Sequence, residues 1–374
     1  MRAAGRWLGV TAAAMSVAVG AAACAGASAR RSTRAVSSFG HMAGYVWTGR
    51  VTAVSASWSV PRMSGHGDAH ASTWIGAQAI GRPRRSPFIQ VGTVEDRGST
   101  HPTYGAFWTD TIRGFHPQIL FHVHAGDAVS TGLTLIGGRW RINIADTTSG
   151  QTASFFTREE GAGGFDLAEW LQEDPGQTSG RVTHYPRLST VRMRALAVNG
   201  TVPRYSDVFA QWMSLPGRDL APTPLRDAAF AITRGVLTPA GRQYLAMARP
   251  QNAGARTVDL EEPRWTARTP ARQIERASRA AAASEWRYAA ALAGSAWPVA
   301  ARAPIGVMVR EVRQEAAVFA ASARQAPTSL VAWRGQFAPI VPRLVQLAHE
   351  VRRALHLPEL VSGPVSAASA RRSG

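Results

Sequence analysis

Between residues 41 and 235 the chain alternates between apolar and polar positions in many short runs. Apolar residues occupy every second position of residues 54–60, with small polar residues between them, and again of residues 140–144. A period of two is typical of a β-strand whose faces meet different surroundings. Turn-forming pairs such as Gly126-Asp127 and Asn199-Gly200 separate the runs. The pattern predicts a mainly β domain at residues 41–235, an antiparallel β-sandwich of two packed sheets.

The pattern changes after residue 235. Residues 236–270 are rich in Pro and Arg and predict a connector with a short helix at 240–248. Apolar residues then recur at steps of three and four within 271–297, 305–324 and 328–356, where Pro339 and Pro342 predict a kink. We expect these stripes to form the core of a smaller α-helical domain at 271–357, followed by a disordered polar tail at 358–374. The alternative is an amphipathic surface that lies on a membrane or on the sandwich.

One strand carries two carboxylates among apolar residues. Residues 165–174 read Phe-Asp-Leu-Ala-Glu-Trp-Leu-Gln-Glu-Asp. In a strand, Glu169 and Glu173 point to the same side as Leu167 and Leu171. Because an ionised carboxylate is costly to bury without a partner, this arrangement favours a partly dry cleft. A solvated sheet edge and an acidic helix are the alternatives.

The first 29 residues have the pattern of a secretory signal peptide. Two arginines precede an apolar run at residues 7–23, which is too short and too weakly apolar to favour a membrane span. The only cysteine, Cys24, follows three alanines, so lipid attachment at Cys24 is an alternative to cleavage after Ala29. Residues 30–40 predict a polar linker. We therefore expect a secreted protein without a disulfide bond.

The composition is basic but globular. The formal net charge is +18 and all basic residues are arginine, with 45% hydrophobic residues, which excludes a disordered chain. This charge favours peripheral contact with an anionic cell envelope. Since the sequence contains no recognisable nucleic-acid-binding module, we expect no nucleic-acid partner.

Three motifs in order carry a family resemblance. They are Trp74-Ile75-Gly76, then Phe88-Ile89-Gln90-Val91-Gly92, then Ala168-Glu169-Trp170-Leu171-Gln172-Glu173. Shorter matches fall in the same order across residues 38–234, including Ala56-Ser57-Trp58-Ser59-Val60-Pro61, Tyr104-Gly105-Ala106-Phe107-Trp108, Gly126-Asp127 and Thr148-Ser149-Gly150-Gln151. Together they resemble the glutamic peptidases called eqolisins. The resemblance implies a concanavalin-like sandwich with a cleft across one bent sheet, and a monomeric endopeptidase that acts on proteins or peptides without a cofactor.

The resemblance places the catalytic residues at Gln90 and at Glu173, the second Glu of its motif. A single Glu can take a proton from water and later donate it to the leaving nitrogen. A neutral Gln can hold the water through its carbonyl oxygen and the oxyanion through its amide nitrogen. With an unperturbed Glu near pKa ~4.3, such a pair would act in mildly acidic medium. The candidate substrate-binding residues are Trp74, Trp108, Asp110 and Glu169.

Other interpretations of these residues stay open. Gln90 alone could be a buried structural amide, and Glu173 alone could pair with an arginine. Thr109 and Asp110 replace a Glu and a Trp of the eqolisin pattern. These replacements support a sandwich that binds extracellular polysaccharide or peptide without cleaving it.

Two further chemistries are less favoured. A glycoside hydrolase would use Glu169 and Glu173 as paired carboxylates, but four positions along a strand separate them by about 13 Å, which is too far for that reaction. His122 and His124 could begin a metal site, although a polar outer face has the same pattern and no second ligand cluster follows. We therefore expect no metal.

Overall fold

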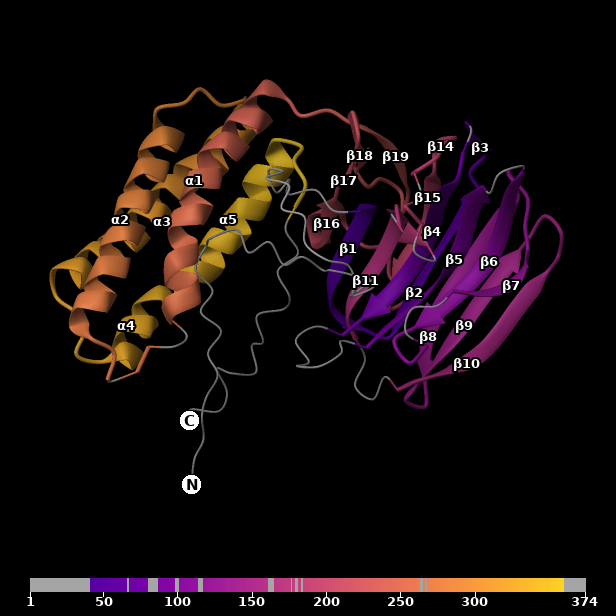
Figure 1. The fold of residues 1–374 in the computed structure, drawn as a ribbon, viewed down its shortest axis with the longest axis horizontal. Helices are drawn as coiled ribbons and strands as arrows, with labels where there is room; N and C mark the ends of the chain where they lie inside the picture. The colour runs from indigo at the N-terminus through magenta and orange to yellow at the C-terminus, as the bar shows by residue number, and fades with distance from the viewer. Residues whose placement is uncertain are drawn as a thin grey trace. The chain divides into compact units, whose positions relative to one another are not determined.

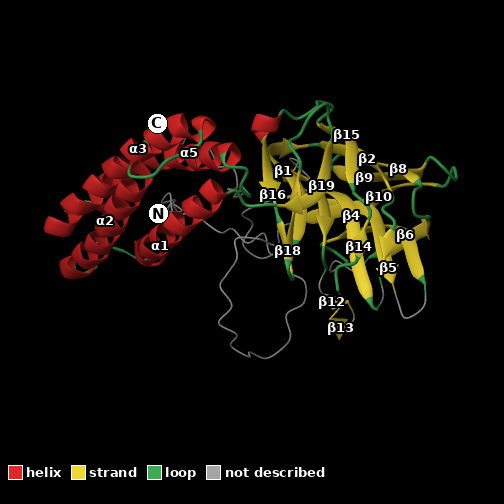
Figure 2. Cartoon of the chain, turned by 90° about the horizontal axis from the view of Figure 1, so that it is seen from above, coloured by secondary structure: helices red, strands yellow, loops and turns green. Residues whose placement is uncertain are grey.

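The described part of the chain forms two compact units. The computed structural model describes residues 41–65, 67–79, 87–97, 101–113, 117–160, 165–175, 177–178, 181–182, 184–262, 265–266 and 268–359. The division between the units falls between Val236 and Leu237, with strands before it and helices after it (Figure 1, Figure 2). The predicted signal peptide at 1–29, Cys24, the linker at 30–40 and the tail from residue 360 lie outside the described residues.

Seven strands form the first sheet of the β unit. Their order across the sheet is β16-β1-β11-β4-β5-β6-β7, and each neighbouring pair is antiparallel. The strands are β1 (Met42–Val51), β4 (Ala69–Gln78), β5 (Phe88–Arg97), β6 (Pro102–Asp110), β7 (Gln118–His122), β11 (Phe165–Glu173) and β16 (Val208–Gln211). The strand with the two carboxylates, β11, therefore lies inside the sheet, between β1 and β4.

Eight strands form the second sheet, in the order β10-β9-β8-β2-β15-β19-β18-β17. They are β2 (Ala53–Ser59), β8 (Ala128–Ile136), β9 (Arg139–Asp146), β10 (Thr152–Glu160), β15 (Arg192–Val198), β17 (Met213–Leu215), β18 (Arg218–Pro222) and β19 (Phe230–Gly235). Smaller elements are the pairs β3 (Met63–Ser64) with β14 (Arg187–Leu188) and β12 (Gln177–Thr178) with β13 (Arg181–Val182), and a 3-10 helix at Tyr205–Asp207.

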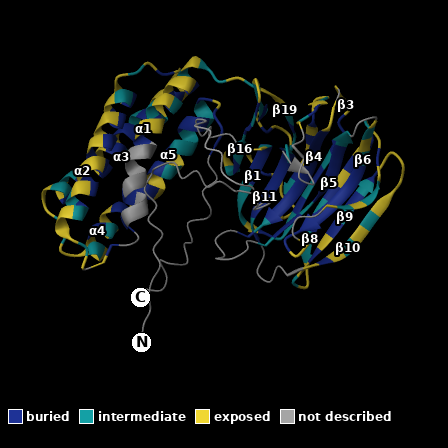
Figure 3. Cartoon of the chain, viewed as in Figure 1, coloured by how far each residue is buried: buried dark blue, intermediate teal, exposed yellow. Residues whose placement is uncertain are grey.

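The core of the β unit lies between the two sheets. It combines every second residue of strands in both sheets, for example Ala168 and Trp170 of β11 with Trp140 and Ile142 of β9. These four side chains are fully buried. Figure 3 shows buried stretches along the strands of the β unit. Burying one large apolar side chain contributes about 1.5–3 kcal/mol. The predicted antiparallel sandwich is therefore confirmed, and the alternation in the sequence identifies its inward faces.

Five helices form the second unit: α1 (Pro239–Glu261), α2 (Ala271–Ala293), α3 (Val299–Arg324), α4 (Leu330–Phe337) and α5 (Ile340–Ala354). Two apolar clusters hold them together, one around Ile305, Met308 and Leu344 and the other around Phe319 and Trp333. The predicted apolar stripes are thus core residues of a helical domain. None of the helices in the described part of the chain is both long and apolar enough to cross a membrane.

The helical unit differs from the sequence prediction in the length of one helix and in the form of one break. The region predicted as a connector at 236–270 holds a helix of 23 residues, α1, which begins with a hydrogen bond from Gly241 N to Thr238 Oγ1. Tyr244 and Ala248 of α1 pack into the first apolar cluster, which offsets the low helix propensity of this Pro- and Gly-containing stretch. At Ala338-Pro339 the predicted kink is a full break between α4 and α5.

Candidate active site

The candidate site lies on the outer face of the seven-stranded sheet, which is the face turned away from the sandwich core. On β11 the outer positions are Leu167, Glu169, Leu171 and Glu173, because Ala168 and Trp170 belong to the core. A second, small apolar cluster covers part of this face and contains Trp74, Phe88, Val94, Phe107 and Leu171. The two glutamates therefore share one face, as the sequence predicted, and that face is partly apolar.

Strand register brings four outer-face residues into one row. Glu169 of β11 pairs with Gly76 of β4, Gly76 pairs with Gln90 of β5, and Gln90 pairs with Thr109 of β6. Paired residues in neighbouring strands point to the same face. We call these four residues the Glu169–Thr109 row. The row joins Glu169, the acid of the third motif, to Gln90, the amide of the second motif, across the single intervening strand β4.

Gly76 leaves the space between the acid and the amide open. Two strand spacings separate Glu169 from Gln90, about 10 Å between Cα atoms. Each side chain can reach about 5 Å from its Cα, so the two groups can meet above Gly76. A Cβ placed on Gly76 would lie 3.0 Å from Glu169 Oε2, so the carboxylate already leans over the glycine toward Gln90.

The environment of Glu169 favours its neutral form. Its side chain is buried, and Oε2 has no hydrogen-bond partner among the described residues. Burial, with a smaller effect from the charge of Glu173, raises the pKa of Glu169 to about 8. Gln90, in contrast, is only partly buried. The row thus combines a carboxyl group shielded from solvent, that of Glu169, with a side-chain amide that solvent can reach, that of Gln90.

The strand register does not bring Gln90 to Glu173, the pair that the sequence predicts as catalytic. Glu173 pairs with Ser72, and Ser72 pairs with Val94, which lies four positions from Gln90 on β5. The offset is about 13 Å along the strands and about 10 Å across them, beyond the reach of one bridging water. The carboxylate that faces Gln90 is Glu169.

Glu173 instead anchors the indole of Trp74. Trp74 Nε1 donates to Glu173 Oε2 at 2.9 Å, and Ser72 Oγ donates to the same oxygen at 3.3 Å. Burial raises the pKa of Glu173, although these two hydrogen bonds work against the rise. The Trp74 ring lies over Gly76 and packs edge-on against Phe88. Trp74 is 1% exposed, so in this structure it is a wall of the site rather than an open substrate platform.

Two of the predicted substrate-binding residues lie elsewhere. Trp108 points into the sandwich core, where its ring packs against Phe155. Asp110 pairs with the core residue Ile89, and its Oδ1 accepts a hydrogen bond of 2.8 Å from the backbone N–H of Arg113. Side chains alternate between the two faces of β6, so Trp108 and Asp110 point to the inner face and Thr109 points to the outer face. For this reason the row contains Thr109 and neither of the other two.

Comparison with known proteins supports the family resemblance. Residues 40–204 match the Peptidase A4 family. The eqolisin resemblance of this part of the chain is confirmed. A comparison with curated protein sequences found no match.

Solved structures of glutamic peptidases are similar to this chain at low identity. Scytalido-glutamic peptidase with a transition-state analogue inhibitor is 18% identical, with a TM-score of 0.44, covering 52% of this chain and 98% of that chain. SCP-B, a member of the eqolisin family in complex with the tripeptide Ala-Ile-His, is 19% identical, with a TM-score of 0.43 and the same two coverages. Aspergilloglutamic peptidase from Aspergillus niger is 16% identical, with a TM-score of 0.36, covering 45% of this chain and 99% of that chain.

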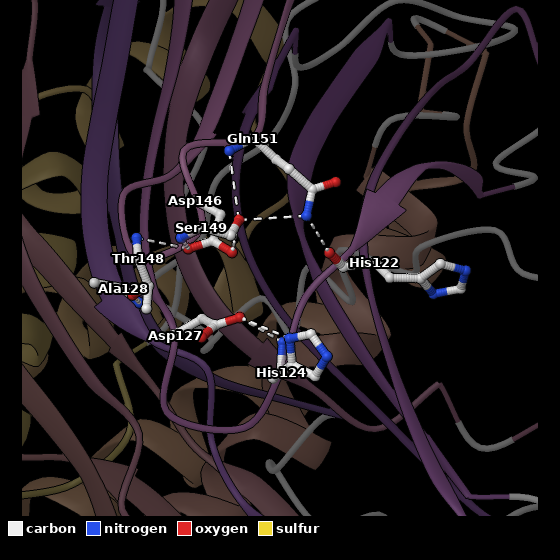
Figure 4. Close-up of polar contacts among 8 residues, drawn as sticks. All are labelled: His122, His124, Asp127, Ala128, Asp146, Thr148, Ser149 and Gln151. Atoms are coloured by element: carbon white, nitrogen blue, oxygen red, sulfur yellow. Dashed lines mark hydrogen bonds and ion pairs between the residues drawn. The ribbon is translucent and has the colours of Figure 1, made fainter.

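Two further motifs of the peptidase-like domain form turns at one end of the second sheet. Asp127 Oδ2 accepts a hydrogen bond of 2.6 Å from His124 N, and Asp146 accepts from Thr148 N and from the Ser149 hydroxyl (Figure 4). Although burial works against it, these bonds to Ser149 and Thr148 lower the pKa of Asp146. Gln151 Nε2 donates to the backbone oxygen of His122. These residues stabilise loops. None of them is paired with a residue of the Glu169–Thr109 row.

The histidines considered as metal ligands do not form a cluster. Strand β7 ends at His122, and His124 lies beyond it with Nδ1 3.4 Å from Asp127 Oδ2. Within the described ranges, no group of three or more His, Cys, Asp or Glu side chains could hold a metal ion.

Another buried acid, Glu95, lies on the inner face of the same sheet. Its Oε1 accepts a hydrogen bond of 2.8 Å from Thr93, and Thr73 donates to Gln172 beside it at 2.6 Å. Burial raises the pKa of Glu95 to about 8, although hydrogen bonds from Thr93 and Gln172 oppose the rise. The sequence analysis does not single out Glu95. Its position would have been predictable, because Glu95 lies an even number of residues from Ile89 and Val91 and so points to the same inner face of the strand.

Proposed function

We propose that the β unit is a glutamic endopeptidase whose acid is Glu169 and whose amide is Gln90. The observation that carries the proposal is the register that pairs Glu169 with Gly76 and Gly76 with Gln90. The match of residues 40–204 to a peptidase family supports hydrolysis of peptide bonds as the reaction class. Proteins or peptides are the substrates, and secretion of the enzyme is part of the same proposal.

The chemistry needs one water between the two side chains. Ionised Glu169 takes a proton from this water while the water oxygen attacks the scissile carbonyl carbon. Gln90 Oε1 holds the water, and Gln90 Nε2–H donates to the oxyanion that forms. Glu169 then donates its proton to the amide nitrogen, the C–N bond breaks, and a carboxylic acid and an amine leave.

The raised pKa of Glu169 changes the expected pH dependence. The acid-acting enzyme expected from the sequence rests on an unperturbed Glu. With a pKa of about 8, Glu169 is mostly protonated in mildly acidic medium and is a competent base only as the pH approaches that value. We therefore propose activity that increases from acidic toward neutral and slightly basic pH.

The decisive experiment compares two glutamates on the same face of the same strand. Hydrolysis of a labelled peptide is measured for the wild type, Glu169→Gln, Glu173→Gln and Gln90→Ala. We expect Glu169→Gln and Gln90→Ala to lose at least about 100-fold in kcat/KM, the usual cost of a general base or an oxyanion donor. Glu173→Gln should keep most of the activity. The opposite ranking of the two glutamates would refute the assignment of Glu169.

A sandwich that binds peptides without cleaving them is the competing function. The burial of Glu169, which favours its neutral form, is the observation on its side. Binding of the labelled peptide without hydrolysis between pH 5 and pH 8.5 would support this function and exclude the peptidase.

A further inference from the structure

Thr109 has a feature that its neighbouring threonines lack. Its side chain is 0% exposed, and its Oγ1 has no hydrogen-bond partner among the described residues. The other buried threonines described on these strands use their hydroxyls: Thr73 donates to Gln172, and Thr93 donates to Glu95. Thr111, directly after β6, accepts a hydrogen bond from Phe88 N. A buried polar group without a partner is rare in folded proteins and calls for an explanation.

The register places this hydroxyl beside the proposed catalytic amide. Thr109 on β6 pairs directly with Gln90 on β5. Residues in direct opposition have Cβ atoms about 4.5–5.5 Å apart, so a rotation of the Gln90 side chain can bring its amide to the hydroxyl. Gln90 thus lies between two buried oxygen atoms that have no hydrogen-bond partner in the described part of the chain, Glu169 Oε2 on one side and Thr109 Oγ1 on the other.

A Gln amide must be held in one of two orientations to be useful. The reaction proposed above needs Oε1 to face the water and Glu169, with Nε2 turned away. The amide can flip by half a turn, which would exchange the acceptor and the donor. A hydroxyl on the side opposite Glu169 can accept from Nε2, and this bond selects the productive orientation without adding a charge to the site.

We propose that Thr109 is a positioning residue, whose hydroxyl accepts a hydrogen bond from Gln90 Nε2 and so turns Gln90 Oε1 toward Glu169. This role rests on the proposed function. The second Nε2–H remains available for the oxyanion. A carboxylate at position 109, by contrast, would add a further negative charge beside Glu169 and raise its pKa.

The test uses Thr109→Val, which keeps the shape and removes the hydroxyl, and Thr109→Ser, which keeps the hydroxyl. We expect Thr109→Val to lower kcat by about tenfold at unchanged KM, because a misoriented amide affects the transition state more than binding. Thr109→Ser should restore kcat to within about threefold of the wild type. Thr109→Val should remain folded and nearly as stable as the wild type, because it keeps the shape of the side chain and the partly exposed Gln90 amide can donate to water instead. Loss of folding then cannot explain the loss of activity.

Thr131→Val is the matched control. Thr131 is also a buried threonine, but its hydroxyl bonds to the backbone oxygen of Ala56 in the second sheet. We expect this variant to lower the melting temperature and leave kcat unchanged. Wild-type kcat in Thr109→Val would overturn the proposal.

A second readout separates this proposal from the proposed function. Hydrogen exchange of the Gln90 side-chain amide is followed by NMR in protein with 15N-labelled glutamine, with and without a saturating peptide whose scissile amide is reduced. Slower exchange in the wild type and Thr109→Ser than in Thr109→Val supports the contact, even if the wild type cleaves no peptide. Equal exchange in all three proteins under both conditions overturns it.

Discussion

Replacing Gly76 with alanine tests whether the open space between Glu169 and Gln90 is needed. A Cβ at this position would lie 2.7 Å from Trp74 Cζ3, 3.0 Å from Glu169 Oε2 and 3.1 Å from Phe88 Cε2. These distances are shorter than ordinary van der Waals contact, so at least one neighbour must move. The hydrogen bond to Glu173 holds the Trp74 ring, and Oε2 of Glu169 has no such partner among the described residues. We therefore expect the carboxylate to be displaced.

The magnitude follows from that displacement. Overpacking of a close-packed site costs about 1–3 kcal/mol of stability, whereas a shift of about 1 Å in a catalytic group can cost about 100-fold in rate. Gly76→Ala should therefore remain folded and lose about 100-fold in kcat/KM. The assay combines hydrolysis of a labelled peptide with urea unfolding of the same protein.

Gly105→Ala is the control for Gly76→Ala. Gly105 lies on the outer face of the same sheet, and a Cβ there would meet Ile119 atoms at 3.2 and 3.3 Å. Ile119 is 53% exposed and can move away, so we expect near-normal activity. Activity of Gly76→Ala within threefold of the wild type would refute the reasoning, as would an equal loss in Gly105→Ala.

Three further predictions concern the buried charges. In a pH–rate profile, kcat/KM should rise as the pH approaches 8. Glu173→Gln should move this rise to lower pH, because it removes a negative charge that raises the pKa of Glu169. An unshifted profile would contradict the electrostatic effect of Glu173 on Glu169. Trp74→Phe leaves the Glu173 carboxylate without its indole donor, so the free energy of unfolding should fall by about 1–3 kcal/mol in urea titrations. Stability should also fall as the pH rises from 6.5 to 8, because Glu95 and Glu169, with pKa values of about 8, keep protons in the folded state that the unfolded chain releases near 4.5. The slope is up to about 1.4 kcal/mol per pH unit for each carboxyl. His70, whose pKa burial lowers to about 4, acts in the opposite direction but mainly below pH 6.5. A melting temperature that stays constant between pH 6.5 and 8, or an equally steep slope in Glu95→Gln, would contradict this account.

The sequence predicts the strands and the shared face of the two glutamates, but not which glutamate meets Gln90. Alternation within β11 is a local property, so Glu169 and Glu173 can be placed on one side without a structure. Their partners depend on the offset between β4 and β5. Nine residues, 79–87, link these strands, and a link of this length does not determine the register as a two-residue turn would. A shift of the pairing by two residues would keep each side chain on its face and change every partner along it.

The faces of β6 are ambiguous in the sequence for a different reason. Phe107 is 1% exposed on the outer face, and Trp108 is 7% exposed on the inner face. Because apolar residues are buried on both sides, alternation cannot identify the core side. The resemblance drew attention to Trp108 and Asp110, whereas the register with Gln90 selects Thr109. A long-range pairing, absent from any local pattern, decides this part of the site.

Two buried glutamates of this sheet, Glu169 and Glu95, connect the proposed activity with stability. Glu169 lies on the outer face of the seven-stranded sheet and Glu95 on its inner face, and burial raises both pKa values to about 8. Ionisation of Glu169 creates the base that hydrolysis needs, but the same loss of a proton destabilises the folded state. Since Glu95 lies on the core side and does not face Gln90, its ionisation adds only to the destabilisation. The strand order that buries an acid beside the catalytic amide therefore makes the stability of the proposed enzyme fall between about pH 4.5 and 8, and Glu95 makes that fall steeper.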